Sequence, residues 1–531
     1  MSERGAFGVT AAGTERAARG PAAPEGRAAL ESRPGLLRHR GRLALPITTE
    51  TPAEASRADL LFVAEVLEAA GVEPLLVEGS GARPVLAVDA AERPRVRECL
   101  VRAMAAEPFY AKAPGERAVL VTEGGLSGRG KPRVIRLFRP RVEPRGGLRY
   151  GASGAVQLEF WRWGEHTLEP PCENALTRRV LPRSEVEIVD VERHGRRWRT
   201  IAPMFRPTPE RVRFDIDMVF SWVDGTDVEF QRARARRMAS YVVGEGDAHE
   251  ARFRQIDELR YALRSVHLFA PWVRRIFIAT DSPAPAWLAD DPRVTIVRSE
   301  EFFADPSVLP THNSQAVESQ LHRIHGLAEH YLYSNDDMFF GRPVEPELFF
   351  TPGGATRFVP ATTRIGLGAP DARRSGFENA ARVNRALLER RFGVTITRHL
   401  EHCAAPFAKS VVRELEREFA DEFARTAASP FRSVSDVSVT NSLYHWYALL
   451  TGRASIGEGA RVRYIDTTMR RGLVEMDRLL ARRDVDMFCL NDGSFPELEA
   501  EERSGAVRSF LQRYFPVSAP WERAAAASAI A

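Results

Sequence analysis

Between Phe214 and about Phe358 the sequence alternates short apolar runs with amphipathic stretches, and this alternation most constrains the fold. The apolar runs predict strands at 216–223, 275–279, 294–297 and 331–333. The amphipathic stretches predict helices at 229–242, 257–269 and 315–329. Strands that alternate with helices are typical of an α/β sheet. We therefore expect a Rossmann-like α/β core over residues 214–357.

Two adjacent carboxylates, Asp336 and Asp337, follow the last of these predicted strands, directly after Asn335. Open α/β sheets bind ligands in the crevice beyond the carboxyl ends of their strands. Carboxylates buried at that edge are costly unless a cation or ligand faces them. Mg²⁺ is commonly held by one or two carboxylates together with substrate phosphates. An acidic turn would explain the pair taken alone, but its polar neighbourhood favours a ligand site.

Further polar clusters lie at the edges of the same α/β pattern. A glycine between acidic residues follows the first predicted strand, where it lets the backbone approach a ligand closely. Carboxylates at the start of the 257–269 helix complement its positive end, and two arginines four residues apart suit a phosphate. A solvated helix face is the alternative. These candidates are Asp224, Gly225 and Asp227, then Asp257, Glu258, Arg260 and Arg264.

The predicted helix at 315–329 carries a third cluster. Ser314 is suited to cap its first turn, since serine is a favoured N-cap residue. Glu318 and His322 are four residues apart and share one face, and Arg323 follows.

The remaining sequence divides by composition and pattern. Residues 1–54 are rich in Arg, Ala, Gly and Pro without periodicity, which predicts a disordered tail. Prolines mark a linker, and the region after Phe358 becomes mainly helical. The expected domains are a small α+β domain at 55–203, a linker at 204–213, the α/β core at 214–357, a mainly helical part at 358–515 and a tail at 516–531.

Composition excludes several classes of protein. A net charge of +4 over 531 residues is too small to argue for nucleic acid. The N-terminus has no apolar signal-peptide core, and no apolar stretch approaches the roughly 20 residues that span a bilayer. The 4 cysteines are scattered and indicate neither a disulfide framework nor a Cys-based metal site. We therefore expect a soluble, cytoplasmic protein.

Four blocks of sequence, in order from about Phe214 to Phe515, resemble the Stealth family. The first is Asp217-Met-Val-Phe-Ser-Trp-Val-Asp-Gly-Thr-Asp227, and the second begins Arg252-Phe-Arg-Gln-Ile-Asp-Glu-Leu-Arg260 and ends at the Asp pair. The third runs from Arg391 to Asp436, and the fourth is Phe488-Cys-Leu-Asn-Asp492. That family comprises bacterial capsular polysaccharide phosphotransferases and the catalytic subunit of lysosomal-enzyme N-acetylglucosamine-1-phosphotransferase.

The third block departs from the family pattern at two positions. Cys403-Ala-Ala separates His402 from Pro406, where the family commonly has His followed closely by Pro. Lys409 stands where relatives tend to carry Arg, which replaces a bidentate fork with a point charge. Neither change removes a proton-transfer group.

The resemblance implies a GT-A-like, nucleotide-sugar-binding core completed by the helical C-terminal part. It also implies transfer of a sugar-1-phosphate from a nucleotide sugar, with a UDP-linked hexosamine as the expected donor, to a sugar hydroxyl. The products would be a phosphodiester in capsule or cell-surface polysaccharide and UMP. The partners would be the donor and an oligosaccharide or polysaccharide acceptor. A lipid-linked acceptor would bring the protein to the inner face of the membrane.

The reaction assigns a role to each candidate. Mg²⁺ or Mn²⁺ would be bound by Asp336, Asp337 and Asp492. His402 would be the base, with His399 as the rival, because imidazole titrates near neutrality. Arg432 would stabilise charge on the transferring phosphoryl group. The expected substrate contacts are Asp224, Gly225, Asp227, Asp257, Glu258, Arg260, Ser314, His322, Arg323, Asn335, Lys409 and Asn491.

Two other functions remain open at this point. A metal-dependent glycosyltransferase would use the same strand-end acids but release UDP. A glycan-binding protein would keep the fold without turnover. The 55–203 domain would either select the acceptor or mediate homo-oligomerisation.

Overall fold

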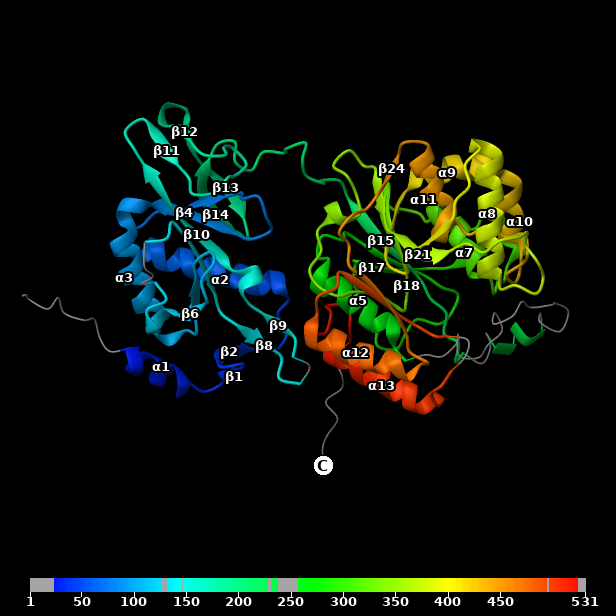
Figure 1. The fold of residues 1–531 in the computed structure, drawn as a ribbon, viewed down its shortest axis with the longest axis horizontal. Coiled ribbons are helices and arrows are strands. Elements are labelled where there is room, and N and C mark those ends of the chain that lie inside the picture. The colour runs from blue at the N-terminus through cyan, green and yellow to red at the C-terminus, as the bar shows by residue number, and fades with distance from the viewer. Residues whose placement is uncertain are drawn as a thin grey trace, which may run out of the picture. The chain divides into compact units, whose positions relative to one another are not determined.

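The computed structural model describes residues 23–126, 131–145, 147–227, 231–232, 234–236, 256–493 and 496–523, and the chain forms two compact units (Figure 1). The N-terminal unit comprises residues up to Pro46, then 56–141 and 151–204. The C-terminal unit comprises Ile47–Ala55, Val142–Tyr150 and the chain from Phe205 onward. The predicted 214–357 and 358–515 parts are therefore one unit, to which two earlier segments also belong.

The N-terminal unit is an α+β fold built on strand β10 (Val156–Trp163). This strand pairs in parallel with β4 (Val85–Asp89) and antiparallel with β7 (Val134–Phe138). The helices are α2 (Pro52–Ala69) and α3 (Arg93–Ala103). The other strands are β3 (Leu75–Val77), β5 (Tyr110–Lys112), β6 (Val119–Leu120), β11 (Thr167–Glu169), β12 (Leu181–Pro182), β13 (Ile188–Arg193) and β14 (Arg196–Ile201). Strand β8 (Arg141–Val142) has one residue in each unit, and β9 (Arg149–Tyr150) belongs to the C-terminal unit.

Part of the predicted disordered tail is folded. Residues after 22 form α1 (Ala23–Glu31) and a hairpin of β1 (Leu37–His39) and β2 (Arg42–Pro46). Leu30 and Leu43 are buried in a cluster with Tyr110 and Phe138. The prediction is wrong for residues 23–54, because these few apolar residues suffice to anchor an otherwise polar segment. Residues 1–22 lie outside the described part of the chain.

The core of the C-terminal unit is a five-stranded sheet in the order β17-β16-β15-β18-β23. The first four strands are parallel, and only β23 runs antiparallel. This arrangement confirms the predicted α/β core. The strands are β15 (Ile216–Ser221), β16 (Ile276–Ala279), β17 (Val294–Val297), β18 (His330–Asn335) and β23 (Ala405–Ala408).

Side chains that alternate along these strands pack on opposite faces of the sheet, as the two-residue period of a strand requires. Met218, Phe220 and Leu332 join the core that includes residues of α5, α12 and α13, whereas Val219 and Tyr333 join the core that includes residues of α7 to α11. Figure 1 shows helices on both sides of the sheet. The helices are α5 (Glu258–Phe269), α6 (Ser299–Phe302), α7 (Ser314–Gln320), α8 (Gly376–Phe392), α9 (Lys409–Glu418), α10 (Ala420–Ala428), α11 (Tyr444–Leu450), α12 (Arg470–Arg482) and α13 (Ala500–Tyr514).

A second, three-stranded sheet extends the core directly beyond the Asp pair. Strand β19 (Met338–Phe340) pairs antiparallel with β26 (Met487–Asn491), which pairs in parallel with β25 (Val462–Asp466). This sheet places the fourth sequence block beside the end of the second. Two further ribbons join β20 (Thr356–Phe358) to β24 (Ala454–Ile456) and β21 (Pro360–Arg364) to β22 (Arg398–Leu400).

Parts of the predicted helical structure differ from the observed helices. The helix expected at 315–329 ends at Gln320 and continues as a 3₁₀ turn, Leu321–Arg323. In the C-terminal part, predicted to be mainly helical, residues 407–423 are divided among β23, α9 and α10, and residues 437–450 include a π-helical turn, Val439–Leu443, before α11. Most of the helix predicted at 229–242 lies outside the described residues.

The C-terminal residues 516–523 are packed rather than a tail. Trp521 is fully buried in the core of the C-terminal unit, and its carbonyl oxygen accepts a hydrogen bond from the Ala289 N–H at 2.9 Å. The prediction of a tail is wrong for these residues, because a short segment without periodicity can still bury a large aromatic side chain.

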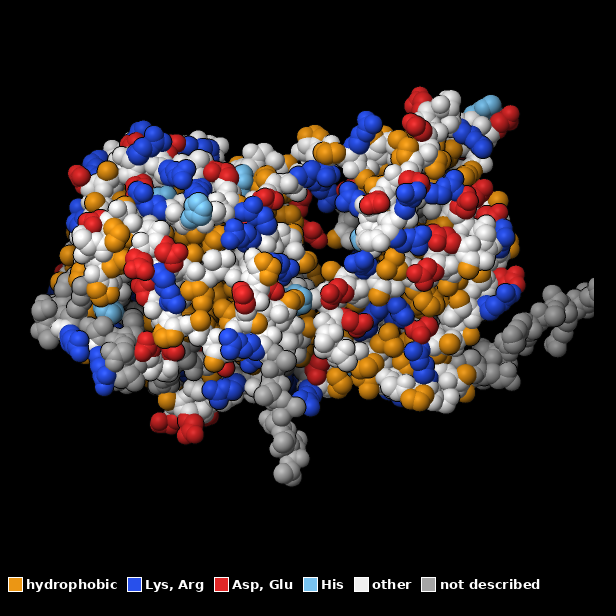
Figure 2. Space-filling model, turned by 180° about the vertical axis from the view of Figure 1, so that it is seen from behind, with side chains coloured by type: hydrophobic (Ala, Val, Ile, Leu, Met, Phe, Trp, Pro, Cys, Tyr) orange, Lys and Arg blue, Asp and Glu red, His pale blue; other side chains and the backbone are white. Residues whose placement is uncertain are grey.

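The surface mixes charges of both signs. On the face drawn in Figure 2, basic and acidic side chains are interspersed with apolar ones. Among the helices that the structure describes, none combines the length and apolar character needed to cross a bilayer.

Candidate active site

The first and second sequence blocks meet at the carboxyl edge of the main sheet. Strands β15 and β18 are parallel, and Ser221 lies opposite Asn335. The Tyr333 hydroxyl lies 2.7 Å from the Ser221 hydroxyl and donates a 2.8 Å hydrogen bond to Asn335 Oδ1. The turn after β15 and the Asp pair after β18 therefore belong to one edge, as the sequence predicts.

Three carboxylates crowd this edge. Burial raises the pKa of Asp336 well above its ordinary value, and the charges of Asp337 and Glu258 raise it further. Burial also raises the pKa of Glu258, an effect that Arg503 opposes and Asp337 reinforces. A cation would relieve this repulsion, since an opposite charge favours the ionised form of a carboxyl group.

The start of α5 is shaped to hold Glu258 in this place. Asp257 adopts a left-handed backbone conformation with φ of 62°, which is uncommon for a residue other than glycine. Glu258 Oε2 accepts a 2.7 Å hydrogen bond from the N–H of Ile256, so the carboxylate folds back over the turn. Asp257 itself is exposed.

The turn after β15 is fixed by its own polar groups. Asp224 Oδ1 accepts hydrogen bonds from the Thr226 N–H at 2.9 Å and the Thr226 hydroxyl at 2.7 Å. The Asp224 N–H donates to Ser282 Oγ at 2.8 Å, and the Gln231 amide donates to the Gly225 carbonyl at 2.8 Å. Asp227 belongs to the same turn, and its carbonyl accepts from the Gln231 N–H. This backbone is preorganised rather than loose.

The fourth block contributes from strand β26. The Leu490 N–H donates a 2.9 Å hydrogen bond to the carbonyl of Asp337, and the Cys489 thiol donates to Asp337 Oδ2 at 3.4 Å. Asn491 Nδ2 donates to the Tyr464 hydroxyl at 2.6 Å. These contacts place Asn491 beside the Asp pair.

Asp492 is engaged with groups of the protein. It forms an ion pair with Arg503 and accepts a 3.1 Å hydrogen bond from the Thr467 hydroxyl. Arg503 is 2% exposed and also acts on Glu258, so one buried cation lies among the acids. Sequence reasoning missed Arg503 and Tyr464, because their link to the Asp pair arises only through the pairing of β25, β26 and β19.

The third block contributes two histidines near Tyr464 and Phe377. The His402 ring lies 5.3 Å from that of Tyr464 and 6.2 Å from that of Phe377, centroid to centroid. Burial lowers the pKa of His402, which keeps the imidazole neutral and able to accept a proton. Tyr464 in turn has its pKa raised by burial and by acidic neighbours that include Asp337. Tyr464 is thus near both His402 and Asp337.

His399 occupies a different setting from His402. It is 7% exposed and stacks on Phe377 with 4.7 Å between ring centroids. Burial lowers its pKa, and the charges of His402 and Arg382 lower it further.

A series of buried polar contacts links Arg432 to the carboxyl edge of the main sheet. Its Nη2 donates a 2.8 Å hydrogen bond to Ser314 Oγ, and its charge acts on the buried Glu318. Glu318 accepts from the Thr440 hydroxyl and also bonds with Tyr333, the residue whose hydroxyl contacts Asn335. Ser314 is the first residue of α7 and not its cap; Asn313 caps the helix, by accepting from the Gln315 N–H.

Lys409 lies at the far end of the sheet. Residue Ala408 pairs with His330, at the amino end of β18, and the Lys409 N–H donates to the carbonyl of Glu329. Asn335 lies six positions beyond Glu329 along extended chain, which is roughly 20 Å. His322 and Arg323 both bind Glu416 of α9, at 2.9 Å, and share this remote region. Their predicted substrate contacts are not supported by this placement.

Arg260 likewise forms an ion pair with another residue of the protein. Its Nε and that of Arg264 each lie 2.6 Å from a carboxylate oxygen of Glu522, and Arg264 is 7% exposed. The four-residue spacing of the two arginines suggested a phosphate site. Both guanidinium groups instead bind the carboxylate of Glu522 in the C-terminal segment.

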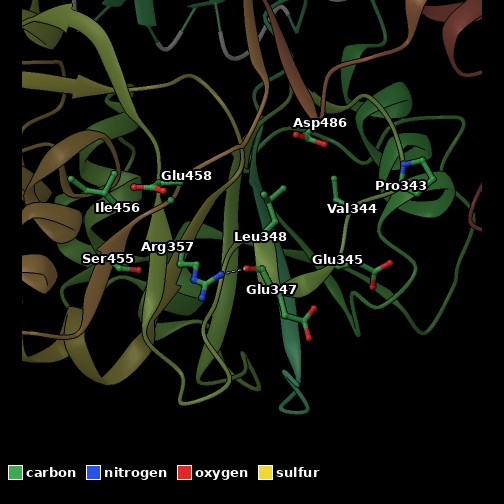
Figure 3. Close-up of a pocket in the computed structure, with 11 residues that line it drawn as sticks. Pro343, Val344, Glu345, Glu347, Leu348, Arg357, Ser455, Ile456, Glu458 and Asp486 are labelled. Carbon is green, nitrogen blue, oxygen red and sulfur yellow. Dashed lines mark hydrogen bonds between the residues drawn. The ribbon is translucent and has the colours of Figure 1, made fainter. Parts of the chain in front are cut away.

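A cavity of about 570 Å³ lies elsewhere in the C-terminal unit (Figure 3). It is lined by residues that include Glu345, Glu347, Arg357 and Asp486, and Arg357 donates to the Glu347 carbonyl at 3.0 Å. Asp486 precedes β26, whose opposite end carries Asn491, so this cavity is separate from the Asp pair.

The carboxylate edge does not form a closed metal cage. Within the described ranges, no group of three or more His, Cys, Asp or Glu side chains is arranged to hold a metal ion. Two adjacent carboxylates in a crowded acidic setting nevertheless match the usual mode of Mg²⁺ binding, in which substrate phosphates and water complete the shell.

Comparison with known proteins gives consistent matches. Conserved regions 1, 2, 3 and 4 of Stealth proteins match residues 214–242, 252–358, 401–449 and 477–529, in that order. The exopolysaccharide phosphotransferase CpsY of Mycobacterium tuberculosis is 57% identical over 93% of this chain and 93% of its own length. The exopolysaccharide phosphotransferase of Nocardia farcinica is 56% identical over 90% of this chain and 89% of its own length.

A solved structure of a galactosyltransferase, LgtC, with donor and acceptor sugar analogues is more distant. It matches with a TM-score of 0.29 and 11% identity, over 57% of this chain and 96% of the solved chain. A likeness at that level does not define the fold.

Proposed function

Because the chain belongs to the Stealth family, we propose that it is an exopolysaccharide phosphotransferase that transfers a sugar-1-phosphate from a nucleotide sugar to a sugar hydroxyl. The observation that carries the proposal is that the Asp pair of the second block and His402 of the third block both lie near Tyr464 of strand β25. We take a UDP-linked hexosamine as the donor.

The reaction needs one bond formed and one broken. The acceptor oxygen attacks the phosphorus attached to the sugar, and the bond from that phosphorus to the bridging oxygen breaks. The nucleoside monophosphate departs with the bridging oxygen, and the acceptor proton passes to a base. Positioning and charge stabilisation supply most of the catalysis in phosphoryl transfer.

We assign the metal to Asp336 and Asp337. Their mutual repulsion and that of Glu258 fit a divalent cation, Mg²⁺ or Mn²⁺. Such an ion would supply charge neutralisation for the diphosphate of the donor. Asp492 then does not bind the metal. Its role is to form an ion pair with Arg503, which holds the Arg503 guanidinium against the acidic edge.

We assign proton transfer to His402. Its pKa is lowered by burial, so the neutral ring that can take the acceptor proton is the form present at neutral pH. His399 remains the alternative, but it is stacked on Phe377 and 7% exposed, which limits its access to a substrate hydroxyl.

Arg432 is suited to bind the transferring phosphoryl group. Ser314 and Glu318 orient it, and Tyr333 joins this chain to the strand that carries the Asp pair. Donors preorganised in this way stabilise charge without reorganising during the reaction.

The released nucleotide tests the proposal. Purified protein is incubated with Mg²⁺ or Mn²⁺, a panel of UDP-sugars and short oligosaccharide acceptors. UMP together with a phosphodiester-linked product supports the phosphotransferase. UDP would instead identify a glycosyltransferase, and glycan binding without any nucleotide release would identify a binding protein.

Paired variants strengthen the test. Asp337→Asn and His402→Ala should each abolish or greatly reduce transfer in a folded protein. Asp421→Asn and His325→Ala, which change exposed residues of the same types, should transfer at the wild-type rate. Wild-type turnover by His402→Ala would remove the base assignment.

We further propose that the N-terminal unit selects the acceptor or mediates homo-oligomerisation, and that a lipid-linked acceptor recruits the protein to the membrane. The separate globular fold of this unit supports such an added role. Light scattering measures the oligomeric state, and vesicles with and without a lipid-linked acceptor test recruitment.

A further inference from the structure

Tyr464 is an aromatic residue near both groups that the proposed reaction uses, the Asp pair and His402. It lies on β25 and is 41% exposed, so a substrate can reach it. The stretches that match conserved regions 3 and 4 are 401–449 and 477–529. Tyr464 lies between them, so its place beside the Asp pair arises from the fold and not from a matched block.

One face of the second sheet is turned towards the Asp pair. Tyr464 is directly opposite Cys489 in the pairing of β25 with β26, and Asn491 lies two residues further along β26. Paired residues, and residues two apart on a strand, share a face of a sheet. The Cys489 thiol donates to Asp337 Oδ2 from this face. Ile465, which points the opposite way, is buried in the main core of the C-terminal unit.

The Tyr464 hydroxyl has a proton left to donate. Its oxygen accepts a 2.6 Å hydrogen bond from Asn491 Nδ2, and a phenol group can donate one hydrogen bond of its own as well. Among the described residues, Asn491 is the hydrogen-bond partner found for this hydroxyl. Partial burial and the charges of acidic neighbours raise the pKa of Tyr464, so the proton stays on the oxygen at neutral pH.

The reacting atoms of the proposed transfer lie near this hydroxyl. The His402 ring meets that of Tyr464 at 60°, with 5.3 Å between centroids, and Asp337 acts on Tyr464 through its charge. In the proposed reaction the base faces the acceptor oxygen, and the Asp pair faces the donor diphosphate. The transferring phosphorus lies in line between the attacking and leaving oxygens. A residue near both the base and the Asp pair therefore borders the transferring phosphoryl group.

We propose that Tyr464 is a catalytic residue whose hydroxyl donates a hydrogen bond to an oxygen of the transferring phosphoryl group. The proton remains on Tyr464 throughout, so the residue forms and breaks no covalent bond. A donor aimed at an oxygen that gains charge stabilises the transition state. This inference rests on the proposed function and adds a residue to its mechanism.

Asn491 then acts through Tyr464 as a positioning residue. Its amide N–H occupies one lone pair of the phenol oxygen and so directs the hydroxyl proton away from Asn491. The proton is thereby available to the substrate before the substrate binds. Donors that are oriented in advance need no reorganisation during the reaction.

The test separates the hydroxyl from the aromatic ring. Tyr464→Phe removes only the hydroxyl, Tyr464→Ala removes the ring as well, and Asn491→Ala removes the orienting amide. A double variant combines Tyr464→Phe with Asn491→Ala. The control is Tyr331→Phe, which removes a hydroxyl from a buried tyrosine of β18 that stacks on Phe407. UMP release gives kcat and the donor KM, with Mg²⁺ and the UDP-sugar that yields the most UMP.

We expect Tyr464→Phe to lower kcat by about 10²-fold, the usual effect of losing one such donor, and to leave the donor KM unchanged. Asn491→Ala should lower kcat by a smaller factor. The double variant should be no slower than Tyr464→Phe, because Asn491 acts only through the hydroxyl. Tyr331→Phe should transfer at the wild-type rate. Since Tyr464 is exposed, thermal melts should show unchanged stability for Tyr464→Phe.

Other outcomes overturn the inference. A wild-type kcat for Tyr464→Phe would do so, and if Tyr464→Ala is then slow, the ring alone contributes. A raised donor KM with an unchanged kcat would show uniform binding of the substrate and no catalytic role. Additive losses in the double variant would show that Asn491 acts independently of Tyr464. No UMP from wild-type protein would overturn the proposed function and this inference together, which distinguishes that failure from the others.

Discussion

At the scale of single residues, the crowded carboxylates that suit a metal ion also destabilise the metal-free protein. Asp336 is held near Asp337 and Glu258, and its pKa is raised well above the ordinary value. A carboxyl whose pKa is higher in the folded than in the unfolded state binds more protons when folded, so the metal-free protein loses stability as pH rises through the raised pKa. A bound cation would reverse this loss.

This crowding predicts the behaviour of Asp336→Asn. Removing one of three crowded charges should raise the free energy of unfolding of the metal-free protein by on the order of 1 kcal/mol, since one pKa unit corresponds to about 1.4 kcal/mol. The same change should abolish transfer. Thermal melts in EDTA, with Asp421→Asn as the control, measure the first effect. A lower melting temperature for Asp336→Asn would contradict the proposed repulsion.

His402 predicts the acid limb of the pH–rate profile. Because burial lowers its pKa, the neutral base persists below pH 6.5, and activity should decline only at more acidic values. The transfer rate is measured from acidic to neutral pH at saturating Mg²⁺, which limits the contribution of Asp336 protonation. His402→Ala should lower the rate by about 10²–10⁴-fold, the usual contribution of a general base. A midpoint above the ordinary imidazole value would argue against His402.

At the scale of elements, the C-terminal segment secures the helix that carries Glu258. Glu522 binds both Arg260 and Arg264 of α5, and Arg264 Nη1 also donates to the Phe515 carbonyl at 2.8 Å. Residues 516–523 thus fix one side of α5, while its first turn faces the acidic edge. The segment acts on the site through the position of this helix.

Glu522→Gln should therefore destabilise the protein strongly. Removing one partner of a buried ion pair leaves uncompensated charge and costs about 3–5 kcal/mol. Denaturant unfolding measures the loss, and Glu502→Gln is the control, because Glu502 is exposed and lies 3.9 Å from Arg470. Equal stabilities for the two variants would show that Glu522 does not hold α5.

Elements also differ in how well the sequence predicts them. Strands β15, β16, β17 and β18 were predictable because each is an apolar run in the parallel part of the sheet. The early end of α7 was not, because the 3₁₀ turn and Gly326, with φ of 74°, redirect the chain in a way that amphipathic spacing does not reveal.

Some residues of the candidate site can also be predicted from the sequence, and others cannot. The Asp pair and His402 stand out locally, by an acidic strand end and by a sequence block. Tyr464 and Arg503 do not, because Tyr464 acquires its place from strand pairing across distant segments, and Arg503 of α13 acquires its place through Asp492 and Thr467 beside those strands. Lys409 stands in a matching block yet lies at the opposite end of β18, since β23 reverses direction before it.

At the scale of the whole molecule, the C-terminal unit depends on two segments from early in the chain. Ile47 and Leu148 are buried in its main core, and the Ile47 N–H donates to the Val142 carbonyl at 2.9 Å. The Tyr150 hydroxyl also donates to the Glu50 carbonyl at 2.9 Å. The conserved regions alone therefore do not contain the complete core of this unit.

Leu148→Ala should consequently weaken the C-terminal unit. Truncating a buried leucine costs about 2–5 kcal/mol, and hydrogen exchange in β15 and β18 should accelerate. Leu168→Ala, which truncates a leucine buried in the N-terminal unit, is the matched control and should leave exchange in those strands unchanged. Unchanged exchange in β15 and β18 after Leu148→Ala would show that this segment is dispensable.

The two early segments also impose an order on biosynthesis. Residues 47–55 leave the ribosome long before Trp521, yet both belong to the same unit. The C-terminal unit can thus close only after Trp521 has been synthesised, whereas the N-terminal unit, whose last residue is Met204, can fold earlier. A nascent chain stalled before Trp521 would carry a finished N-terminal unit and an incomplete C-terminal unit, so phosphotransfer would begin only after that segment has emerged.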